Sequence, residues 1–408
     1  MRVLHLTPEL PYWPGGSGGA TRQFHLLRRL AELGHEVTVV APIPAGEAHR
    51  TLELAAAGVR VEGPVRPGSR VSETLGALAR QPALVPMAAT LPVLAWQGSV
   101  LWAAMVPHVR RELARRPDVV TVEHDNAAQW VTELPVGVPA VLTLQNVGRG
   151  YYESRARAAG GPRRLALGAE ARRFARHDSR WLPRYCALVA VSDRDAEDLR
   201  ADGARRVEVV PNGVAADELR PAPPSPEPAT VLFTGTLSHP PNSDGIRWFA
   251  ATAWRRVRAA RPEAKLLVVG REPPRSVREL DGREGIEVVG PVADMAPWFA
   301  RATAVVVPLR SGGGTRLKIL EAFAGGRAVV STRVGAEGLD VTDGRELVLA
   351  DREEDIADGV LALLGDAGRR ERLAAASRDL AERRYDWRVL GDQLDEVLRR
   401  VVAGRAGL

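Results

Sequence analysis

Short runs of branched apolar residues alternate along the chain with longer stretches in which apolar positions recur every three or four residues. The short runs predict strands and the longer stretches predict amphipathic helices, an alternation typical of parallel sheets with helical crossovers. The pattern therefore predicts an α/β fold with two doubly wound parallel sheets in series. The expected strands are 2–6, 36–41, 119–122, 140–144, 187–191 and 207–210 in the first half, and 230–234, 264–269, 286–289, 304–308, 328–331 and 347–349 in the second.

A change in composition marks the boundary between the two expected domains. Residues 221–228, PAPPSPEP, contain five prolines, which cannot join a sheet ladder, and Asn212-Gly213 just before them predicts a turn. We expect an N-terminal Rossmann-like domain over 1–212 and a C-terminal one over 213–384. A last helix lies within 385–408 and keeps one apolar stripe, made of Trp387, Leu390, Leu394, Val397 and Val401. Because open α/β sheets bind ligands beyond the carboxyl ends of their strands, we expect a ligand cleft between the domains.

The composition is that of an ordinary globular protein, with 45% hydrophobic and 26% charged positions in 408 residues. The net charge is +6, but only Lys265 and Lys318 are lysines, and the 54 arginines are interleaved with acidic residues. This bias points to coding composition, and no nucleic-acid partner is expected. The single cysteine, Cys186, excludes an intrachain disulfide, and the N-terminal residues lack the pattern of a signal peptide. We therefore expect a cytoplasmic protein.

Two neighbouring segments suggest contact with the inner face of a membrane. Residues 81–109 carry no formal charge but contain four prolines, so they predict buried or interfacial helices rather than a helix that spans a bilayer. Between Arg155 and Arg184 lie seven further arginines, with Glu170 and Asp178 as the main balancing charges. An anionic membrane surface would suit this stretch, and a solvated helix face explains it equally well.

The stretch SGGGTRLKILEAFAGG, residues 311–326, carries the strongest chemical signal. A strand ends at Leu309, a glycine loop follows over 311–314, and Thr315 is a candidate cap for a short helix that stops before Gly325 and Gly326. Arg316 and Lys318 in the first turn would oppose the helix dipole by on the order of a few tenths of a kcal/mol. An anion is therefore expected beside them.

Together these features predict a nucleoside diphosphate site. Glycine loops and helix N-termini offer N–H groups to phosphate, and here the residues involved would be Gly313, Gly314 and Thr315. Arg316 and Lys318 would hold the diphosphate, and Glu321, one turn further, can accept hydrogen bonds from a ribose diol. The alternative is a glycine hinge before an ordinary helix with an i,i+3 ion pair between Lys318 and Glu321.

A second glycine loop, PGGSGGATRQF, follows the first strand at residues 14–24 and opens a helix from about Ala20. Gly16, Gly18 and Gly19 would let a ligand in the cleft approach the backbone, and a plain turn rich in left-handed residues is the alternative. The loop lacks the GxGxxG spacing of a dinucleotide fingerprint.

The chain resembles the retaining glycosyltransferases of family 4, which have the GT-B fold. The likeness lies in four segments in order, RVLHLTPELPYWPGGSGGATRQFHLLRRLAELGHEVTVVAP, ALVAVSDRDAEDL, VEVVPNGV and SGGGTRLKILEAFAGGRAVVST, which are spread over nearly the whole chain. The resemblance implies transfer of a sugar from a nucleotide-activated donor on the second domain to an acceptor on the first. It also implies that the last helix crosses back to the first domain.

The resemblance assigns roles to particular residues. It implies that Glu321 holds the donor ribose, that Arg316 and Lys318 take the diphosphate, and that Gly16, Gly18 and Gly19 border the cleft. Gly235, in the segment FTGTLSHPPNSDG, is counted with the donor-binding residues. Family members of this kind need no bound metal, so no cofactor is expected, because cations stabilise the departing diphosphate.

Three positions depart from the family pattern. Gly313 stands where members often carry a Glu that contacts the transferred sugar, Gln145 stands where many carry a His, and the usual basic pair near Gly235 is unclear. His124, at the end of a predicted strand, is the remaining candidate for contact with the reacting centre, and a structural histidine is the alternative. The DxD pattern at Asp193–Asp195 follows Ser192, which is typical of a helix cap rather than of a metal site.

From these residues we expect a glycosyltransferase that moves a sugar from a UDP- or GDP-sugar to an acceptor hydroxyl. The acceptor would be a sugar, a lipid-linked sugar or a small alcohol, in the assembly of polysaccharide or glycolipid. No residue is an obvious covalent nucleophile, so retention would proceed by front-face displacement. The alternatives are a non-catalytic nucleotide-sugar-binding partner subunit and a GT-B-fold sugar-nucleotide epimerase.

Overall fold

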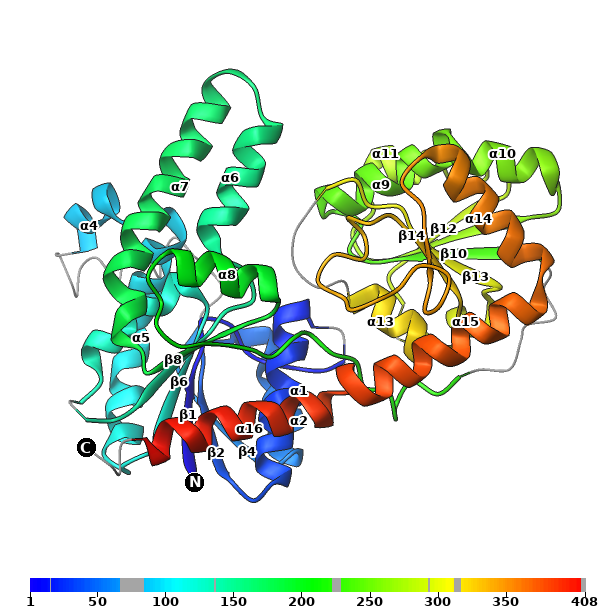
Figure 1. The fold of residues 1–408 in the computed structure, drawn as a ribbon. Helices are drawn as coiled ribbons and strands as arrows, with labels where there is room; N and C mark the ends of the chain where they lie inside the picture. Colours follow the sequence, from blue (N-terminus) through cyan, green and yellow to red (C-terminus); the bar gives the residue numbers. More distant parts are fainter. Residues whose placement is uncertain are drawn as a thin grey trace. The chain divides into compact units, whose positions relative to one another are not determined.

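Figure 1 shows a computed structural model of the chain, which describes residues 1–14, 16–66, 84–135, 137–221, 229–292, 294–311 and 317–404. The chain divides into two compact units. The first comprises Met1–Pro211 together with Leu390–Leu408, and the second comprises Asn212–Val389. The proline-rich segment that was expected to mark the boundary lies, apart from Pro221, outside the described residues.

The first unit is built on a parallel sheet with the strand order β4-β2-β1-β6-β7-β8-β9. Its strands are β1 (Arg2–Leu6), β2 (Glu36–Val40), β4 (Val59–Glu62), β6 (Val119–Glu123), β7 (Ala140–Thr143), β8 (Ala187–Ala190) and β9 (Val207–Val209). A short parallel pair, β3 (Ile43–Pro44) with β5 (Val65–Arg66), lies outside this sheet. Helices cover the faces of the main sheet, so its central strands are buried on both sides and consist mainly of Val, Leu and Ala.

The helices of the first unit connect these strands. They are α1 (Gly18–Glu32), η1 (Ala45–Arg50), α2 (Thr51–Ala56), α4 (Leu84–Thr90), α5 (Val93–Leu113), η2 (Asp125–Glu133), α6 (Gly148–Ala158), α7 (Gly161–Trp181), η3 (Leu182–Arg184) and α8 (Asp193–Ala201). The expected cap at Ser192 is confirmed, because its hydroxyl accepts a hydrogen bond from the Asp195 N–H at 3.1 Å. Residues 81–83 of the uncharged segment lie outside the described residues, and the rest of it forms α4 and most of α5. No helix in the described ranges has the length and apolar content needed to cross a membrane.

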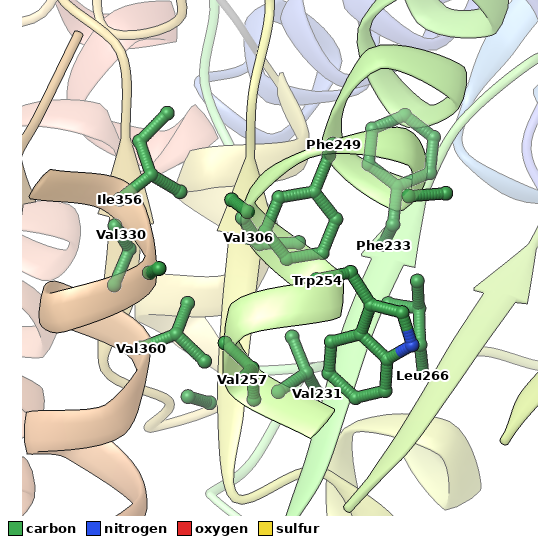
Figure 2. Packing of buried hydrophobic residues seen from close by; sticks show 14 of the residues in the cluster. Val231, Phe233, Phe249, Trp254, Val257, Leu266, Val306, Val330, Ile356 and Val360 are labelled. Atoms are coloured by element: carbon green, nitrogen blue, oxygen red, sulfur yellow. The ribbon is translucent and has the colours of Figure 1, made fainter. Parts of the chain in front are cut away.

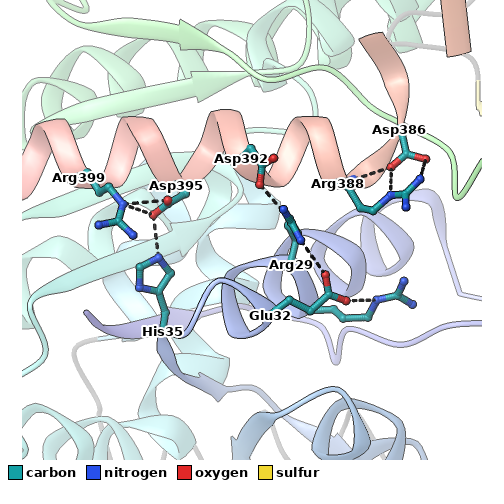
Figure 3. A network of polar contacts seen from close by, with 9 residues as sticks. Arg29, Glu32, His35, Asp386, Arg388, Asp392, Asp395 and Arg399 are labelled. Atoms are coloured by element: carbon teal, nitrogen blue, oxygen red, sulfur yellow. Dashed lines mark hydrogen bonds and ion pairs between the residues drawn. The ribbon is translucent and has the colours of Figure 1, made fainter. Parts of the chain in front are cut away.

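The last helix, α16 (Trp387–Ala403), starts in the second unit and continues in the first. All five residues of the expected apolar stripe are buried. Figure 3 shows how α16 is also held by polar contacts, since Asp392 pairs with Arg29 at 2.8 Å and Asp395 pairs with His35 at 2.7 Å. The two helices approach closely at Gly391, where a Cβ would lie 2.4 Å from the Arg29 Cγ. α16 is therefore an integral part of the first unit.

The second unit has a parallel sheet with the strand order β12-β11-β10-β13-β14-β15. Its strands are β10 (Thr230–Thr234), β11 (Lys265–Val269), β12 (Ile286–Gly290), β13 (Ala304–Val307), β14 (Val329–Ser331) and β15 (Val348–Leu349). Its helices are α9 (Pro240–Ala251), α10 (Ala253–Ala260), α11 (Arg275–Arg278), α12 (Ala296–Arg301), α13 (Leu317–Ala324), α14 (Glu353–Gly365), α15 (Ala367–Leu380) and η4 (Ala381–Tyr385).

One face of the second sheet packs on α9, α10 and α14 around a cluster of buried side chains (Figure 2). Trp254 and Phe249 are fully buried there against Val231 and Val306. The Trp254 indole N–H donates to the Glu284 carbonyl at 3.0 Å, so its one polar group is satisfied. This core fixes β10, whose carboxyl end carries the site described below.

The two doubly wound parallel sheets confirm the α/β prediction. Each of the twelve expected strands is present, with both ends within one residue of the predicted ends. The short strands β3, β4 and β5 were not predicted.

Candidate functional site

The carboxyl end of β10 and the helix α13 together form a small polar site in the second unit. The chain turns at Gly235, whose φ is +143° and whose N–H donates to the Val269 carbonyl at 3.1 Å. Lys318 Nζ donates to Asn242 Oδ1 at 2.7 Å and lies 4.4 Å from the centre of the Phe233 ring. Its ammonium group is thus placed by a hydrogen bond and a cation–π contact, directly above the end of the strand.

The backbone at Gly235 is part of this arrangement. A Cβ at this position would lie 2.7 Å from Lys318 Nζ and 3.0 Å from Asn242 Nδ2, so no larger residue fits without moving them. Asn242 is in turn fixed by a hydrogen bond to the Thr236 carbonyl at 2.8 Å. The structure therefore brings together two of the predicted donor-site residues, Gly235 and Lys318.

Glu321 lies one turn further along α13. Most of this helix is buried, including Ala322 beside Glu321. Lys318 and Glu321 are the charged residues of this helix and both are partly exposed. Burial raises the pKa of Glu321, and the charge of Lys318 partly offsets this effect. The carboxylate accepts no hydrogen bond from the described part of the chain, so it is open to a ligand hydroxyl.

The glycine loop before α13 lies outside the described residues, and with it Gly313, Gly314, Thr315 and Arg316. Their expected contacts with phosphate stay predictions. α13 is described from Leu317, two residues after the expected start.

Two further polar residues at this edge were not singled out from the sequence. Asn242 positions Lys318, and Arg271 Nη2, in the loop that follows β11, reaches Thr236 Oγ1 at 3.4 Å. Arg271 could have been found, because it stands two residues after a predicted strand that neighbours β10. The role of Asn242 could not be predicted from the sequence, since its contact with Lys318 depends on how α9 and α13 pack.

In the first unit, the loop after β1 surrounds Glu9 with hydrogen-bond donors. Glu9 Oε1 accepts from Gln23 Nε2 at 3.0 Å and contacts His124 Nε2 at 3.3 Å. Glu9 Oε2 accepts from the Ser17 hydroxyl at 3.3 Å, and that hydroxyl also caps α1 by accepting from the Ala20 N–H at 3.0 Å. Ser17 is the cap, so the helix begins at Gly18 rather than at Ala20 as predicted.

The three glycines predicted to border a cleft lie in and just after this loop. A Cβ at Gly19 would lie 2.1 Å from Gln145 Oε1 and 2.6 Å from Glu9 Oε1, and one at Gly16 would lie 2.7 Å from the Tyr12 carbonyl. Gly18 is the exposed first residue of α1. Gly19 is thus the point where the helix start meets the polar side chains.

His124 follows β6 in an unusual backbone conformation. Its backbone angles are φ +71° and ψ 143°, a combination that residues other than glycine rarely adopt. Its N–H donates to the Thr143 carbonyl at 2.8 Å. Burial disfavours the charged imidazole, but the hydrogen bond to Glu9 and the charges of Glu123, Glu9 and Asp125 outweigh it, so the pKa of His124 is raised. The structure places His124 as a strained and readily protonated side chain beside Glu9.

Gln145, which stands where many family members carry a His, is tied to a buried carboxylate. Its Nε2 donates to Glu123 Oε1 at 2.9 Å, and the Thr143 hydroxyl donates to Glu123 Oε2. Glu123 is only 2% exposed. Gln145, Glu123, Glu9 and His124 thus form one polar cluster at the carboxyl ends of β1, β6 and β7.

A second group of buried titratable residues lies behind His124. Asp125 Oδ2 accepts from the Gly148 N–H at 2.6 Å, and burial, with the nearby charge of Asp178, raises the pKa of Asp125 to about 7. Asp178 contacts His177 Nδ1 at 3.1 Å, and burial, with the charge of Asp202, raises the pKa of Asp178 to about 8. Burial lowers the pKa of His177 to about 4. Asp178 and His177 are therefore mostly neutral near pH 7. The group joins the end of β6 to α6 and α7.

Two family models match the chain. The model described as Glycosyltransferase Family 4 matches residues 16–218, and the model described as Glycosyl transferases group 1 matches residues 228–366, so together they cover 342 of the 408 residues. The chain belongs to glycosyltransferase family 4. The resemblance seen in the sequence is therefore confirmed.

Two curated relatives of this family 4 chain are named for inositol-containing compounds. The phosphatidyl-myo-inositol mannosyltransferase of Mycobacterium leprae is 32% identical over 232 residues, which are 54% of this chain and 61% of that protein. The D-inositol 3-phosphate glycosyltransferase of Xylanimonas cellulosilytica is 35% identical over 225 residues, which are 49% of this chain and 54% of that protein. The alignments thus span less than two thirds of the length of these relatives.

Solved structures match the chain over nearly its full length. Sucrose-phosphate synthase from Thermosynechococcus elongatus has a TM-score of 0.71 at 16% identity and covers 99% of this chain and 100% of its own. Anabaena HepE in complex with UDP and glucose has a TM-score of 0.66 at 15% identity and covers 98% of this chain and 99% of its own. At these identities the likeness shows the fold, and the predicted GT-B fold is confirmed.

Proposed function

We propose that the protein transfers a glycosyl group from a nucleoside diphosphate sugar to an acceptor hydroxyl. The observation that carries this proposal is the placement of Lys318 over the end of β10, with Glu321 one turn further on the same helix. A cation near a strand end suits a diphosphate, and a carboxylate with unused acceptors suits a ribose diol. In this proposal Lys318 binds the diphosphate with Arg316, and Glu321 binds the ribose.

The names of related proteins indicate two candidate nucleobases and a general class of acceptor. A Corynebacterium glutamicum relative, 29% identical over 212 residues, is named as GDP-mannose-dependent, and HepE was solved with UDP. We therefore propose a UDP- or GDP-sugar donor. For the acceptor we propose an alcohol, soluble or lipid-linked, of the polyol class that the names of the curated relatives indicate. We place the reaction at the cytoplasmic face of a membrane.

The chemistry we propose uses fixed cations for the donor and the polar cluster around His124 for the acceptor. Lys318 and Arg316 would stabilise the charge that develops on the leaving diphosphate, a role for which one oxyanion-hole donor of an acyl-transfer enzyme, worth about 2.7–4 kcal/mol, sets the scale. His124, oriented by Glu9 at 3.3 Å, would hydrogen-bond the acceptor hydroxyl. The leaving diphosphate would assist removal of the acceptor's proton in a front-face displacement, with retention. The protein's own residues thus bind, orient and neutralise charge, with no covalent intermediate.

Release of nucleoside diphosphate from UDP- and GDP-sugars, with inositol, inositol phosphate and phosphatidylinositol as acceptors, tests this proposal. We expect acceptor-dependent release with one nucleotide, reduced at least 100-fold in Lys318→Ala and unchanged in the exposed control Lys265→Ala. Binding of nucleotide sugar without turnover on any acceptor would favour a non-catalytic partner subunit instead. Conversion of the sugar nucleotide with no acceptor present would favour an epimerase.

A further inference from the structure

The helices α6 and α7 form an antiparallel hairpin that projects from the first unit (Figure 1). They are joined by Ala159 and Gly160, and from residue 153 to residue 166 nearly every described side chain of both helices is exposed or half-buried. Only the first half of α6 and the second half of α7 contact the rest of the unit. The hairpin is thus an arm with a free end.

The base of this arm is firmly attached. Asp125 Oδ2 accepts the first N–H of α6, from Gly148, at 2.6 Å, and His177 Nε2 on α7 contacts Gln129 Oε1 at 2.8 Å. The rings of Tyr152 and Phe174 stack with their centres 5.5 Å apart and lock the two helices together. The free end is therefore presented by a rigid base.

The arm carries the net charge of the whole chain. Residues 148–181 contain nine arginines, and Glu153, Glu170 and Asp178 are the acidic residues, which gives +6. The formal net charge of the 408 residues is also +6, so the other 374 residues balance, with 47 basic against 47 acidic. The arginines of the outer part are Arg155, Arg157, Arg163 and Arg164. In the described part of the chain none of these four pairs with an acidic side chain, whereas Arg149 and Arg173, nearer the base of the hairpin, pair with Glu153 and Glu170.

Apolar side chains are exposed among these arginines. Leu165 is 74% exposed at the start of α7, and Tyr151 is 46% exposed on α6. The start of α5 adds Val93, 48% exposed, whose N–H donates to Glu170 in the middle of α7. Arginines interspersed with Leu, Val and Tyr fit a surface that offers phosphate groups above an apolar layer. A nucleic acid would match the charge and leave the apolar residues in water.

We infer that the α6–α7 hairpin docks the protein on a bilayer that contains anionic lipids, with the arginines of its free end on the headgroups and Leu165 in the interface. This inference rests on the proposed function in one respect only, since a lipid-linked acceptor would explain why the protein binds a membrane. Its test measures binding and needs no sugar transfer.

The test is flotation of the full chain with vesicles of phosphatidylcholine alone, or with 30 mol% phosphatidylglycerol, in about 50 mM salt. We expect the wild type to float only with the anionic vesicles and to be released near 0.5 M salt. Each arginine at an anionic surface contributes roughly a factor of five. The variant Arg155→Gln/Arg157→Gln/Arg163→Gln/Arg164→Gln should thus bind several hundred-fold more weakly, and Leu165→Ser should bind more weakly at unchanged charge.

A matched control removes the same charge elsewhere. Arg205, Arg255, Arg283 and Arg372 are exposed and lie outside the hairpin, so their fourfold change to Gln also lowers the net charge from +6 to +2. This control should keep most of the binding. Equal loss in both fourfold variants, or a wild type that ignores anionic vesicles, would overturn the inference. A wild type that binds a DNA duplex more tightly than the anionic vesicles would also overturn it, provided that the fourfold hairpin variant loses this DNA binding and Leu165→Ser keeps it. That result would identify a nucleic-acid surface.

Discussion

Replacing Gly235 with Ala tests how the end of β10 supports Lys318. The added Cβ would stand 2.7 Å from Lys318 Nζ and 3.0 Å from Asn242 Nδ2, where van der Waals contact requires about 3.5 Å. The ammonium would have to move by close to 1 Å or rotate away. Its hydrogen bond to Asn242 would be lost at the same time.

The expected magnitude has two separate parts. The φ of +143° at Gly235 is strained for any other residue, which costs about 1–3 kcal/mol of folding stability. Displacing a charge-assisted hydrogen bond to phosphate costs about 1.5–3 kcal/mol of binding free energy. At 1.4 kcal/mol per factor of ten, the Kd for the nucleoside diphosphate should rise roughly 10- to 150-fold.

Isothermal titration calorimetry with UDP and GDP measures the second part, and two variants control for the first. Gly282→Ala places a Cβ at a φ of +72° with nothing within 4 Å, so it introduces backbone strain in the same unit without touching Lys318. It should leave the Kd unchanged. In a Lys318→Ala background, Gly235→Ala should add little further loss, because both changes remove the same contact. Wild-type affinity in Gly235→Ala, or fully additive losses in the double variant, would refute the reasoning.

Three further predictions concern single side chains. Because burial raises the pKa of Asp178 from 3.8 to about 8, the folded protein retains a proton that the unfolded chain releases, so the free energy of unfolding should fall as pH rises from about 4 to about 8. Denaturant titrations should find this decline reduced in Asp178→Asn, and an unchanged decline would contradict the assignment. His124→Gly should be about 1–3 kcal/mol more stable than His124→Ala, since only glycine tolerates its φ of +71°, while both should lose sugar transfer; equal stabilities would argue against backbone strain. Glu321→Gln should stabilise the unliganded protein at pH 7, because burial disfavours the charged carboxylate, yet weaken nucleoside more than diphosphate binding; equal weakening of both ligands would exclude the ribose role.

The strands could be predicted because their signal is local. The central strands consist mainly of Val, Leu and Ala and are buried on both faces, as β8 and β13 illustrate. The edge strand β4 (Val59–Glu62) was missed because it alternates Val with Arg and Glu over four residues, which is also the pattern of a loop. The pairs of residues in β3 and β5 are too short to carry any periodicity.

The candidate site was predictable only where residues stand beside a strand end or a glycine loop. Lys318 and His124 met that condition, and the structure gives each a defined contact. Asn242 contacts Lys318 and Glu9 contacts His124, but neither could be predicted. A polar residue in a loop or at the start of a helix has no sequence pattern of its own. Their partners lie 76 and 115 positions away, and only the packed sheets bring them together.

The most direct test of the central claim is a thermal shift with UDP, GDP and their sugars on wild type, Lys318→Ala and Lys265→Ala, the two lysines of the chain. A ligand at 100 times its Kd stabilises by about 2.7 kcal/mol, which corresponds to roughly 5–10 °C for a domain of this size. The account predicts such a shift with one nucleotide for the wild type and for Lys265→Ala, and none for Lys318→Ala. Equal shifts in both lysine variants, or no shift in the wild type, would contradict it.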